Sequence, residues 1–158
     1  MTIAQNANGV LLGSPRFALF NSSHPGAQIS YSHDVTRYPK QIVGVPQIVF
    51  ISYGHNHSTD IEFRTDYKTL TDKLLTTNPD ICILAMGQNR KIAPATNIQE
   101  HAIRIQQIAS FAASQGWEFV DAYNALLPAD TSDSDGIHPL VSGSLKWSDL
   151  VRFTLGVL

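Results

Sequence analysis

The sequence predicts an α/β fold, a three-layer α/β/α sandwich around a mainly parallel sheet. Short runs rich in Ile, Val and Phe alternate with longer stretches of helical periodicity, a pattern typical of βα units. The chain has 158 residues, 43% of them hydrophobic, which suits one globular domain with its own core. The prolines are scattered, and neither an internal repeat nor a linker is visible. We therefore expect residues 1–158 to form a single domain.

Four short segments are predicted strands because each is rich in β-branched or aromatic residues and is followed by turn-forming residues. They are residues 16–21, 47–52, 80–86 and 117–121. The single cysteine, Cys82, lies in the third of these runs. We expect it to be a small core residue rather than a nucleophile.

The clearest helix is predicted over residues 60–76, where apolar residues recur at steps of four, three and four and Asn78-Pro79 closes the pattern. A second helix is expected after Thr96, which forms a capping-box pattern with Gln99, and it should end before Gly116.

The last helix is expected to start at Pro139, because proline is favoured at the first helical position, and to run toward Leu155. Residues 1–13 are ambiguous between helix and strand.

Charge and hydropathy exclude several classes of partner. The chain has 11 basic and 13 acidic residues, a net charge of −2, and no Lys/Arg cluster to neutralise phosphates, so nucleic acid is not expected to bind. No apolar run reaches the length of a membrane span, and the first residues lack the pattern of a signal peptide. We expect no membrane span and, by default, a cytoplasmic protein.

Ligands of open α/β sheets bind beyond the carboxyl ends of the strands, so the loops there are the places to look for chemistry. Polar side chains and glycines gather in three loops that follow a strand or precede the last helix. These are residues 24–27, 52–57 and 133–139.

Asp135 and His138 are the best acid–base candidates. They are three residues apart with Gly136 between them, and a tight turn would let the carboxylate reach the imidazole Nδ1 while Nε2 points outward as a base. The alternative is that the Asp caps the last helix beside a surface His.

Asn56 and Gly26 are candidates for an oxyanion hole. Asn56 offers an uncharged amide donor after a strand, and Gly26 offers a backbone N–H that an anion can approach because there is no Cβ. Both segments are also compatible with ordinary turns.

The order of these pieces resembles the SGNH hydrolase superfamily, the GDSL-like lipases and esterases. The stretch FNSSHPGA is similar to the block that supplies the oxyanion glycine, VFISYGHNH to the strand with its Gly-x-Asn block, and DGIHP to the terminal block. The resemblance implies a flavodoxin-like α/β/α fold and hydrolysis of an acyl or acetyl ester by a Ser-His-Asp mechanism. It makes His138 and Asp135 catalytic and places Asn56 and Gly26 in the oxyanion hole. It implies a small-molecule ester substrate, no cofactor and no metal.

Two positions depart from the family pattern. His57 stands where the family often has Asp after the block-three Asn, which leaves the support of the Asn56 loop unexplained. No Gly-Asp-Ser nucleophile block occurs in the chain.

Two explanations for the absent nucleophile block are open. Either the domain is shortened at its N-terminus and the nucleophile lies upstream of Met1, or Ser14 is the nucleophile. We favour the first, because Ser14 lies only 12 residues before Gly26, too few for a helical crossover between parallel strands, and Pro15 marks a turn. A sheet without its first strand would expose an unpaired edge and favour self-association.

Other functions are compatible with the same residues. A catalytically degenerate domain of this type would bind a glycan or small ligand without hydrolysis. His55 and His57 with Asp60 could hold a metal ion. A flavodoxin-like anion-binding domain would need a Gly-rich phosphate loop, which the chain lacks. Gly87-Gln88-Asn89 could line the pocket, although an ordinary turn is expected there.

Overall fold

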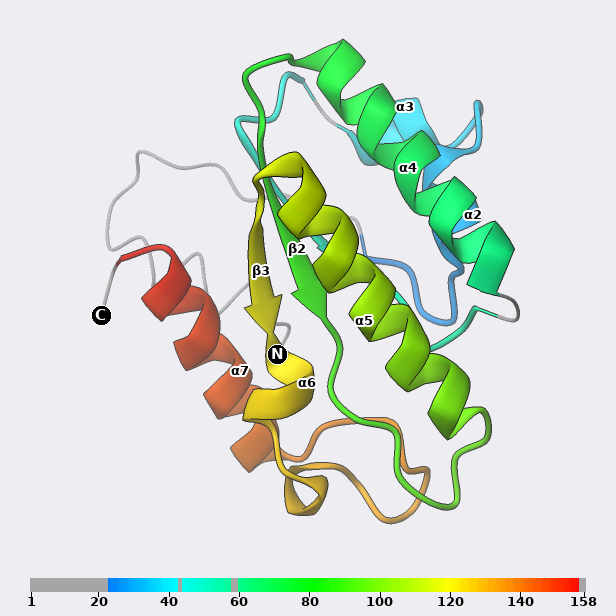
Figure 1. Ribbon diagram of the computed structural model, residues 1–158, viewed down its shortest axis with the longest axis vertical. Coiled ribbons are helices and arrows are strands. Elements are labelled where there is room, and N and C mark those ends of the chain that lie inside the picture. The colour runs from blue at the N-terminus through cyan, green and yellow to red at the C-terminus, as the bar shows by residue number, and fades with distance from the viewer. Residues whose placement is uncertain (1–22, 43, 58–59, 157–158) are drawn as a thin grey trace.

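A three-stranded parallel sheet forms the centre of the computed structural model, which describes residues 23–42, 44–57 and 60–156 (Figure 1). Its strands are β1 (Ile48–Ser52), β2 (Cys82–Gly87) and β3 (Glu118–Asp121), in the order β1-β2-β3. Ile48 pairs with Cys82, and Leu84 pairs with Glu118. Three predicted strands are thereby confirmed, and the fourth, residues 16–21, lies outside the described residues.

Long helices cover both faces of the sheet. Helices α4 (Asp60–Thr77) and α5 (Ile98–Gln115) lie on one side of the strands and α7 (Val141–Thr154) lies on the other (Figure 1). The predicted α/β/α sandwich is therefore confirmed. None of the described helices is both long enough and apolar enough to cross a lipid bilayer.

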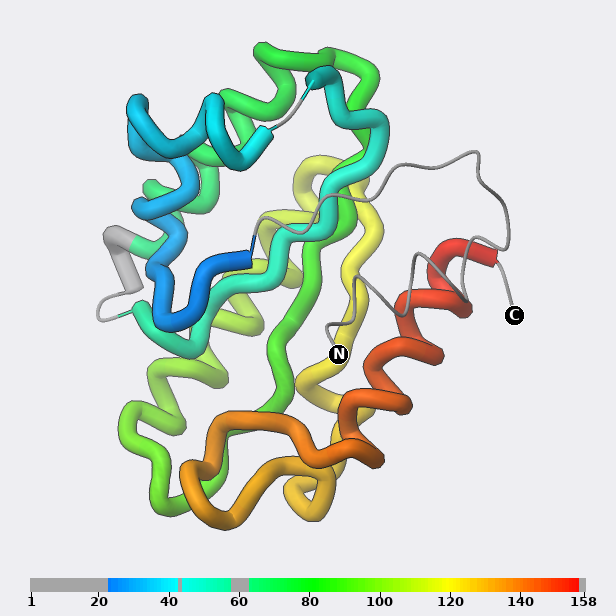
Figure 2. The backbone as a smooth tube through the Cα atoms, turned by 180° about the vertical axis from the view of Figure 1, so that it is seen from behind, coloured from blue at the N-terminus to red at the C-terminus, as the bar shows by residue number. Residues whose placement is uncertain are grey.

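The described residues also form four shorter helical segments that the sequence pattern did not predict. Helices α2 (Ile29–His33) and α3 (Tyr38–Gln41) precede β1 and lie beside α4, as the view from behind shows (Figure 2). Helix α6 (Ala122–Ala125) and the 3₁₀ turn η2 (Pro128–Asp130) connect β3 to the segment before α7.

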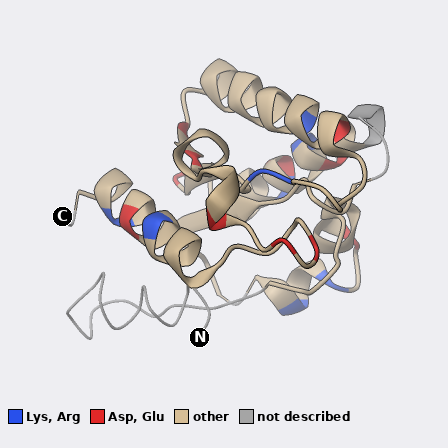
Figure 3. Cartoon of the chain, turned by 90° about the horizontal axis from the view of Figure 1, so that it is seen from below, with Lys and Arg blue, Asp and Glu red and all other residues tan. Residues whose placement is uncertain are grey.

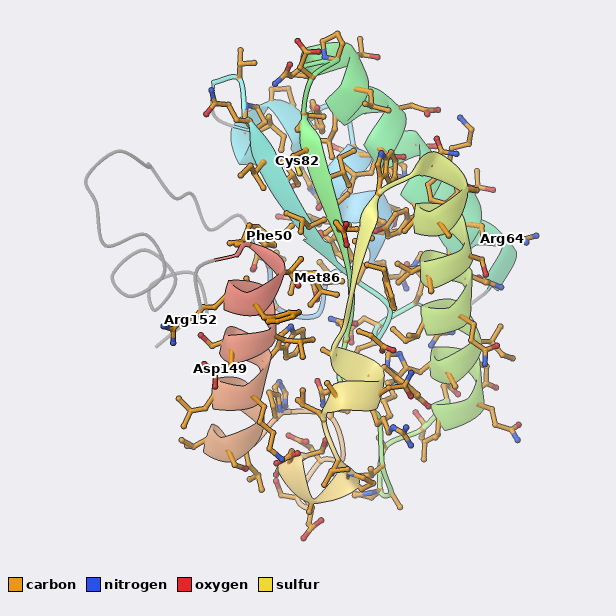
Figure 4. The ribbon with its side chains drawn as sticks, turned by 60° about the vertical axis from the view of Figure 1, so that its left-hand side comes forward. Phe50, Arg64, Cys82, Met86, Asp149 and Arg152 are labelled. Carbon is orange, nitrogen blue, oxygen red and sulfur yellow. The ribbon has the colours of Figure 1, made fainter. Side chains whose placement is uncertain are left out.

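The strands alternate between two apolar cores because successive side chains point to opposite faces. Ile51 and Ile83 are buried in the core under α4 and α5. Met86 is buried in the second core with α7, and Phe50 packs against its edge; Figure 4 shows both on the side of the sheet that faces α7. This alternation explains why the strands read as continuous apolar runs.

Cys82 is exposed, so the expectation of a core cysteine was wrong. As an alternate residue of the strand, it points to the same face of the sheet as Leu84 and Met86, which face α7, but it is the first residue of β2. Figure 4 places it beyond the end of α7, so none of the helices that the structure describes covers it.

The predicted starts of two helices were also wrong. Helix α5 follows Asn97, which has φ +58° and makes no side-chain capping bond, so Thr96 and Gln99 form no capping box. Helix α7 begins at Val141 rather than at Pro139, because Pro139 is engaged in an isolated antiparallel bridge with Thr131.

Candidate active site

Asp135 and His138 are in direct contact in the loop before α7. The imidazole Nδ1 lies 2.7 Å from Asp135 Oδ2. The other carboxylate oxygen accepts the backbone N–H groups of Ile137 at 2.8 Å and His138 at 3.0 Å. Three hydrogen bonds within four residues therefore fix the carboxylate against the ring.

These bonds decide the protonation of the pair. The backbone N–H groups of His138 and Ile137, followed by the His138 ring, lower the pKa of Asp135 to about 2. An ionised carboxylate only accepts, so the proton of a neutral His138 ring sits on Nδ1 and leaves Nε2 as the basic atom. The His138 side chain is 79% exposed, so Nε2 belongs to an accessible imidazole.

Gly136 allows this turn to pack against the loop after β2. Its φ is +67°, and a Cβ at this position would lie 2.0 Å from the carbonyl oxygen of Ile92. The backbone N–H of Ile92 donates to the carbonyl of Gly136 at 2.9 Å. The segment that carries the Asp-His pair is thus held against the carboxyl end of the central strand.

Asn56 is exposed in the turn that follows β1. The preceding Gly54 has φ +138°, and its carbonyl accepts Arg104 Nε at 2.8 Å. The backbone N–H of His55 donates to Gln88 Oε1 at 2.6 Å. Contacts from the segment after β2 and from α5 therefore support the Asn56 loop. The family pattern led us to expect this support from an Asp at the position of His57.

Asn89, a buried residue just beyond β2, contacts both of these loops. Its backbone carbonyl oxygen lies 2.8 Å from His55 Nε2 and 3.0 Å from His101 Nε2. Its side-chain Nδ2 donates to the carbonyl of Ile137 at 2.8 Å. The residue next to Asn56 and the residue next to His138 are therefore bound to the same asparagine.

The two histidines on this carbonyl are neutral at physiological pH. Burial lowers the pKa of His55 to about 4 and the pKa of His101 to about 3. A carbonyl only accepts, so both rings carry their proton on Nε2.

Gly26 lies in an exposed turn before α2 with φ +71°. It lines a shallow open hollow with neighbours that include His24, Tyr31 and Arg37, and neither Asn56 nor His138 is part of that lining. The role of Gly26 beside the other three site residues therefore stays a prediction. Ser14 lies outside the described residues.

The alternative metal site of His55, His57 and Asp60 stays a prediction, because the side chain of Asp60 lies outside the described residues. His55 contacts Asn89, whereas His57 Nε2 lies 3.7 Å from Asp66 Oδ2. No cluster of three His, Cys, Asp or Glu side chains suited to a metal ion occurs in the part of the chain that the structure describes.

Sequence reasoning missed the residues that support the two loops. His101 and Arg104 are fully buried on the face of α5 that also buries Ile105 and Ile108. A His and an Arg on the apolar stripe of a helix could have indicated buried polar partners. For Asn89 the sequence indicated an ordinary turn or a place in the pocket lining, but not its contacts with both loops.

No family model matches the sequence, and no curated protein sequence matches it either. Solved structures do match. A carbohydrate esterase family 3 protein from Talaromyces cellulolyticus has a TM-score of 0.70 at 14% identity, with 97% of this chain and 86% of that chain covered. A member of the lipolytic G-D-S-L family from Veillonella parvula has a TM-score of 0.62 at 17% identity, with coverage of 84% and 77%.

A protein of Agrobacterium tumefaciens assigned as an arylesterase has a TM-score of 0.59 at 18% identity, with 71% of this chain covered. This chain spans 62% of that protein, which is less than two thirds of its length. Identities this low establish the architecture alone. The chain therefore has an SGNH hydrolase-like fold.

Proposed function

We propose that this chain is an esterase that hydrolyses small carboxylic esters at the carboxyl ends of its strands. The observation that carries the proposal is the 2.7 Å contact between Asp135 Oδ2 and His138 Nδ1, which leaves an accessible Nε2 as the base. Support comes from the fold, because the solved structures most similar to it include esterases and a G-D-S-L family member.

In the proposed reaction, a serine hydroxyl attacks the ester carbonyl and passes its proton to His138 Nε2. Asn56 Nδ2 and the backbone N–H of Gly26 stabilise the negative oxygen that forms. The ester C–O bond then breaks, the alcohol leaves with the proton from His138, and water releases the acid from the acyl-enzyme by the same steps. Asp135 orients the ring and stabilises its charged form.

The nucleophile of the proposed reaction is a serine. Ser14 is the candidate within the chain, and a serine upstream of Met1 is the alternative. A fluorophosphonate probe followed by peptide mapping would distinguish them: labelling of Ser14 that is lost in Ser14→Ala would assign the nucleophile to this chain.

The central test is hydrolysis of p-nitrophenyl acetate by the protein and by His138→Ala. We expect His138→Ala to lower kcat by about 10²–10⁴-fold, because it removes the general base. Asp133→Ala, an exposed residue of the same loop, serves as the control and should leave kcat unchanged. Equal rates for the protein and His138→Ala would contradict the proposal. No hydrolysis by either would favour the alternative, a domain that binds a glycan or small ligand without cleaving it.

A further inference from the structure

We propose that Asn89 is a positioning residue that sets the distance between the Asn56 loop and the Asp135–His138 loop. The inference rests on the proposed function for its catalytic meaning. The coupling itself is a property of the fold that can be measured without any activity.

Asn89 lies at the carboxyl end of the sheet. It follows β2, the central strand, and its side chain and backbone are fully buried between the loops that follow β1 and precede α7. In Figure 1 the loop before α7 lies below the arrowheads of β2 and β3. A residue at this position can contact both loops at once.

Asn89 uses different atoms for the two loops. Its backbone oxygen accepts hydrogen bonds from His55 Nε2 and His101 Nε2. Its side-chain Nδ2 donates to the carbonyl of Ile137 at 2.8 Å and to Thr131 Oγ1 at 3.3 Å. A side-chain substitution should therefore release the His138 loop while the bonds that hold the Asn56 loop remain. This separation makes the proposal testable with one isosteric change.

The chemistry requires an amide at this position. The carbonyl of Ile137 needs a donor, and Asn89→Asp would replace that donor by an oxygen that repels it. The His138 loop is also anchored elsewhere, since Ser132 N–H donates to His138 O at 2.8 Å. We therefore expect Asn89→Asp to displace the loop rather than unfold it.

A displacement of about 1 Å between catalytic groups can cost about 10²-fold in rate. The expected effect of Asn89→Asp is thus a fall in kcat of about 10–100-fold, with KM changed by less than about 2-fold because the substrate-binding surface is retained. Because a general loss of folded protein would also lower the apparent kcat at unchanged KM, kcat is expressed per folded molecule, with the folded fraction of each variant measured by circular dichroism.

Asn78 provides a matched control at the opposite end of the sheet. Its Nδ2 donates to the carbonyl of Pro46 at 2.9 Å and joins the segments that precede β1 and β2. Asn78→Asp therefore removes the same kind of bond far from the candidate site. We expect it to leave kcat unchanged.

The experiment compares Asn89→Asp, Asn78→Asp and the unchanged protein by p-nitrophenyl acetate kinetics and by amide hydrogen exchange. The backbone N–H of Ile92, which donates to Gly136, should exchange about 10-fold faster in Asn89→Asp, whereas Asn78→Asp should leave it unchanged. Two-dimensional histidine spectra should show that the Nε2–H tautomers of His55 and His101 persist in Asn89→Asp.

The two readouts separate the failure of this inference from the failure of the proposed function. Equal kcat values in the two variants, or unchanged exchange at Ile92 in Asn89→Asp, would overturn the positioning role. If the unchanged protein hydrolyses no ester, the proposed function fails, and the exchange result alone decides the coupling. If Asn89→Asp does not fold, Thr131→Val removes the weaker contact to the amide and should lower kcat by a few-fold and speed exchange at Ile92. No change in either would count against the proposal.

Discussion

At the scale of single residues, the candidate site depends on where one proton sits. Asp135 receives two backbone N–H groups on one oxygen and His138 Nδ1 on the other, so the carboxylate is ionised and the ring tautomer is determined. The pair is a local structure, because all the donors lie within three residues of the acceptor. The proposed function of His138 as a base depends on the charge of Asp135 and not only on the shape of its side chain.

Asp135→Asn tests this dependence. The amide can keep the bonds to the backbone N–H groups, but its Nδ2 would face His138 Nδ1 as a second donor, so the ring would carry its proton on Nε2 instead. We expect kcat for p-nitrophenyl acetate to fall by at least about 10²-fold. Histidine nitrogen shifts should report the changed tautomer. Asp133→Asn makes the same change of charge in the same loop, and equal kcat values for the two variants would contradict the assigned role.

At the scale of elements, the position of the loop that carries Asp135 and His138 depends on how closely it packs against its neighbours. Asp130 supports the C-terminal side of this loop: its carboxylate accepts Lys146 Nζ at 2.7 Å and its carbonyl accepts Leu140 N–H at 2.7 Å. Gly136 supports the other side through its contact with Ile92. Helix α7 and the loop after β2 thus hold the Asp-His segment between them.

Gly136→Ala should lower the free energy of unfolding more than the same change at Gly116, a glycine with a similar backbone angle but no neighbouring atoms around an added Cβ. Gly116 has φ +69° and no atom within 4 Å of an added Cβ, so Gly116→Ala should cost only the left-handed strain, about 1 kcal/mol. In Gly136→Ala the clash with Ile92 adds about 1–3 kcal/mol. Urea unfolding of both variants measures the difference, and kcat should fall only in Gly136→Ala. Equal losses of stability would show that the close packing is unimportant.

At the scale of the whole molecule, the charged residues that the structure describes are spread over several elements. Two of the groups whose protonation the fold changes most are histidines, His55 and His101. Figure 3 shows basic and acidic residues scattered over several elements. Asp149 and Arg152, for example, pair at 3.4 Å on the outer side of α7, where Figure 4 shows them directed away from the sheet. By contrast, His55 and His101 are held neutral inside, with ring centres 4.5 Å apart.

These two histidines should make the fold sensitive to acid. Their pKa values of about 4 and about 3 in the folded chain lie below the unfolded value of about 6.5, so as pH falls from 6.5 the unfolded state binds protons that the folded state does not. Their contribution is therefore complete above pH 6.5 and declines below it, by up to about 1.4 kcal/mol per pH unit for each histidine.

His101→Gln retains a donor for the Asn89 carbonyl. Between pH 6.5 and 4.5 the free energy of unfolding should fall less steeply with decreasing pH in this variant, because unfolding takes up about one proton fewer. Urea unfolding at a series of pH values measures it. His24→Gln, a change at an exposed histidine, should keep the slope of the unchanged protein. An identical slope in His101→Gln would show that this ring is not held neutral by the fold.

Much of the architecture could be predicted because it follows from local patterns. Apolar runs predicted β1, β2 and β3, and the stripe that includes Phe63 and Leu74 predicted α4, whose members are buried in the core. Helix starts were less predictable. Pro139 matches the usual pattern of a helix start, but its bridge to Thr131 comes from a segment that only the packing brings near.

The sequence by itself determined the layered fold, which follows from the alternation of apolar runs and helical stretches, and it predicted that Asp135 could reach His138, because that contact depends on spacing within one short segment. Only the tertiary structure decided how the Asn56 loop is supported and joined to the His138 loop. The joining contacts link residues 34 and 48 positions apart through Asn89. Hydrogen bonds over such separations depend on which strand ends the packing of α5 and α7 brings together, and the pattern of any one segment does not contain that information.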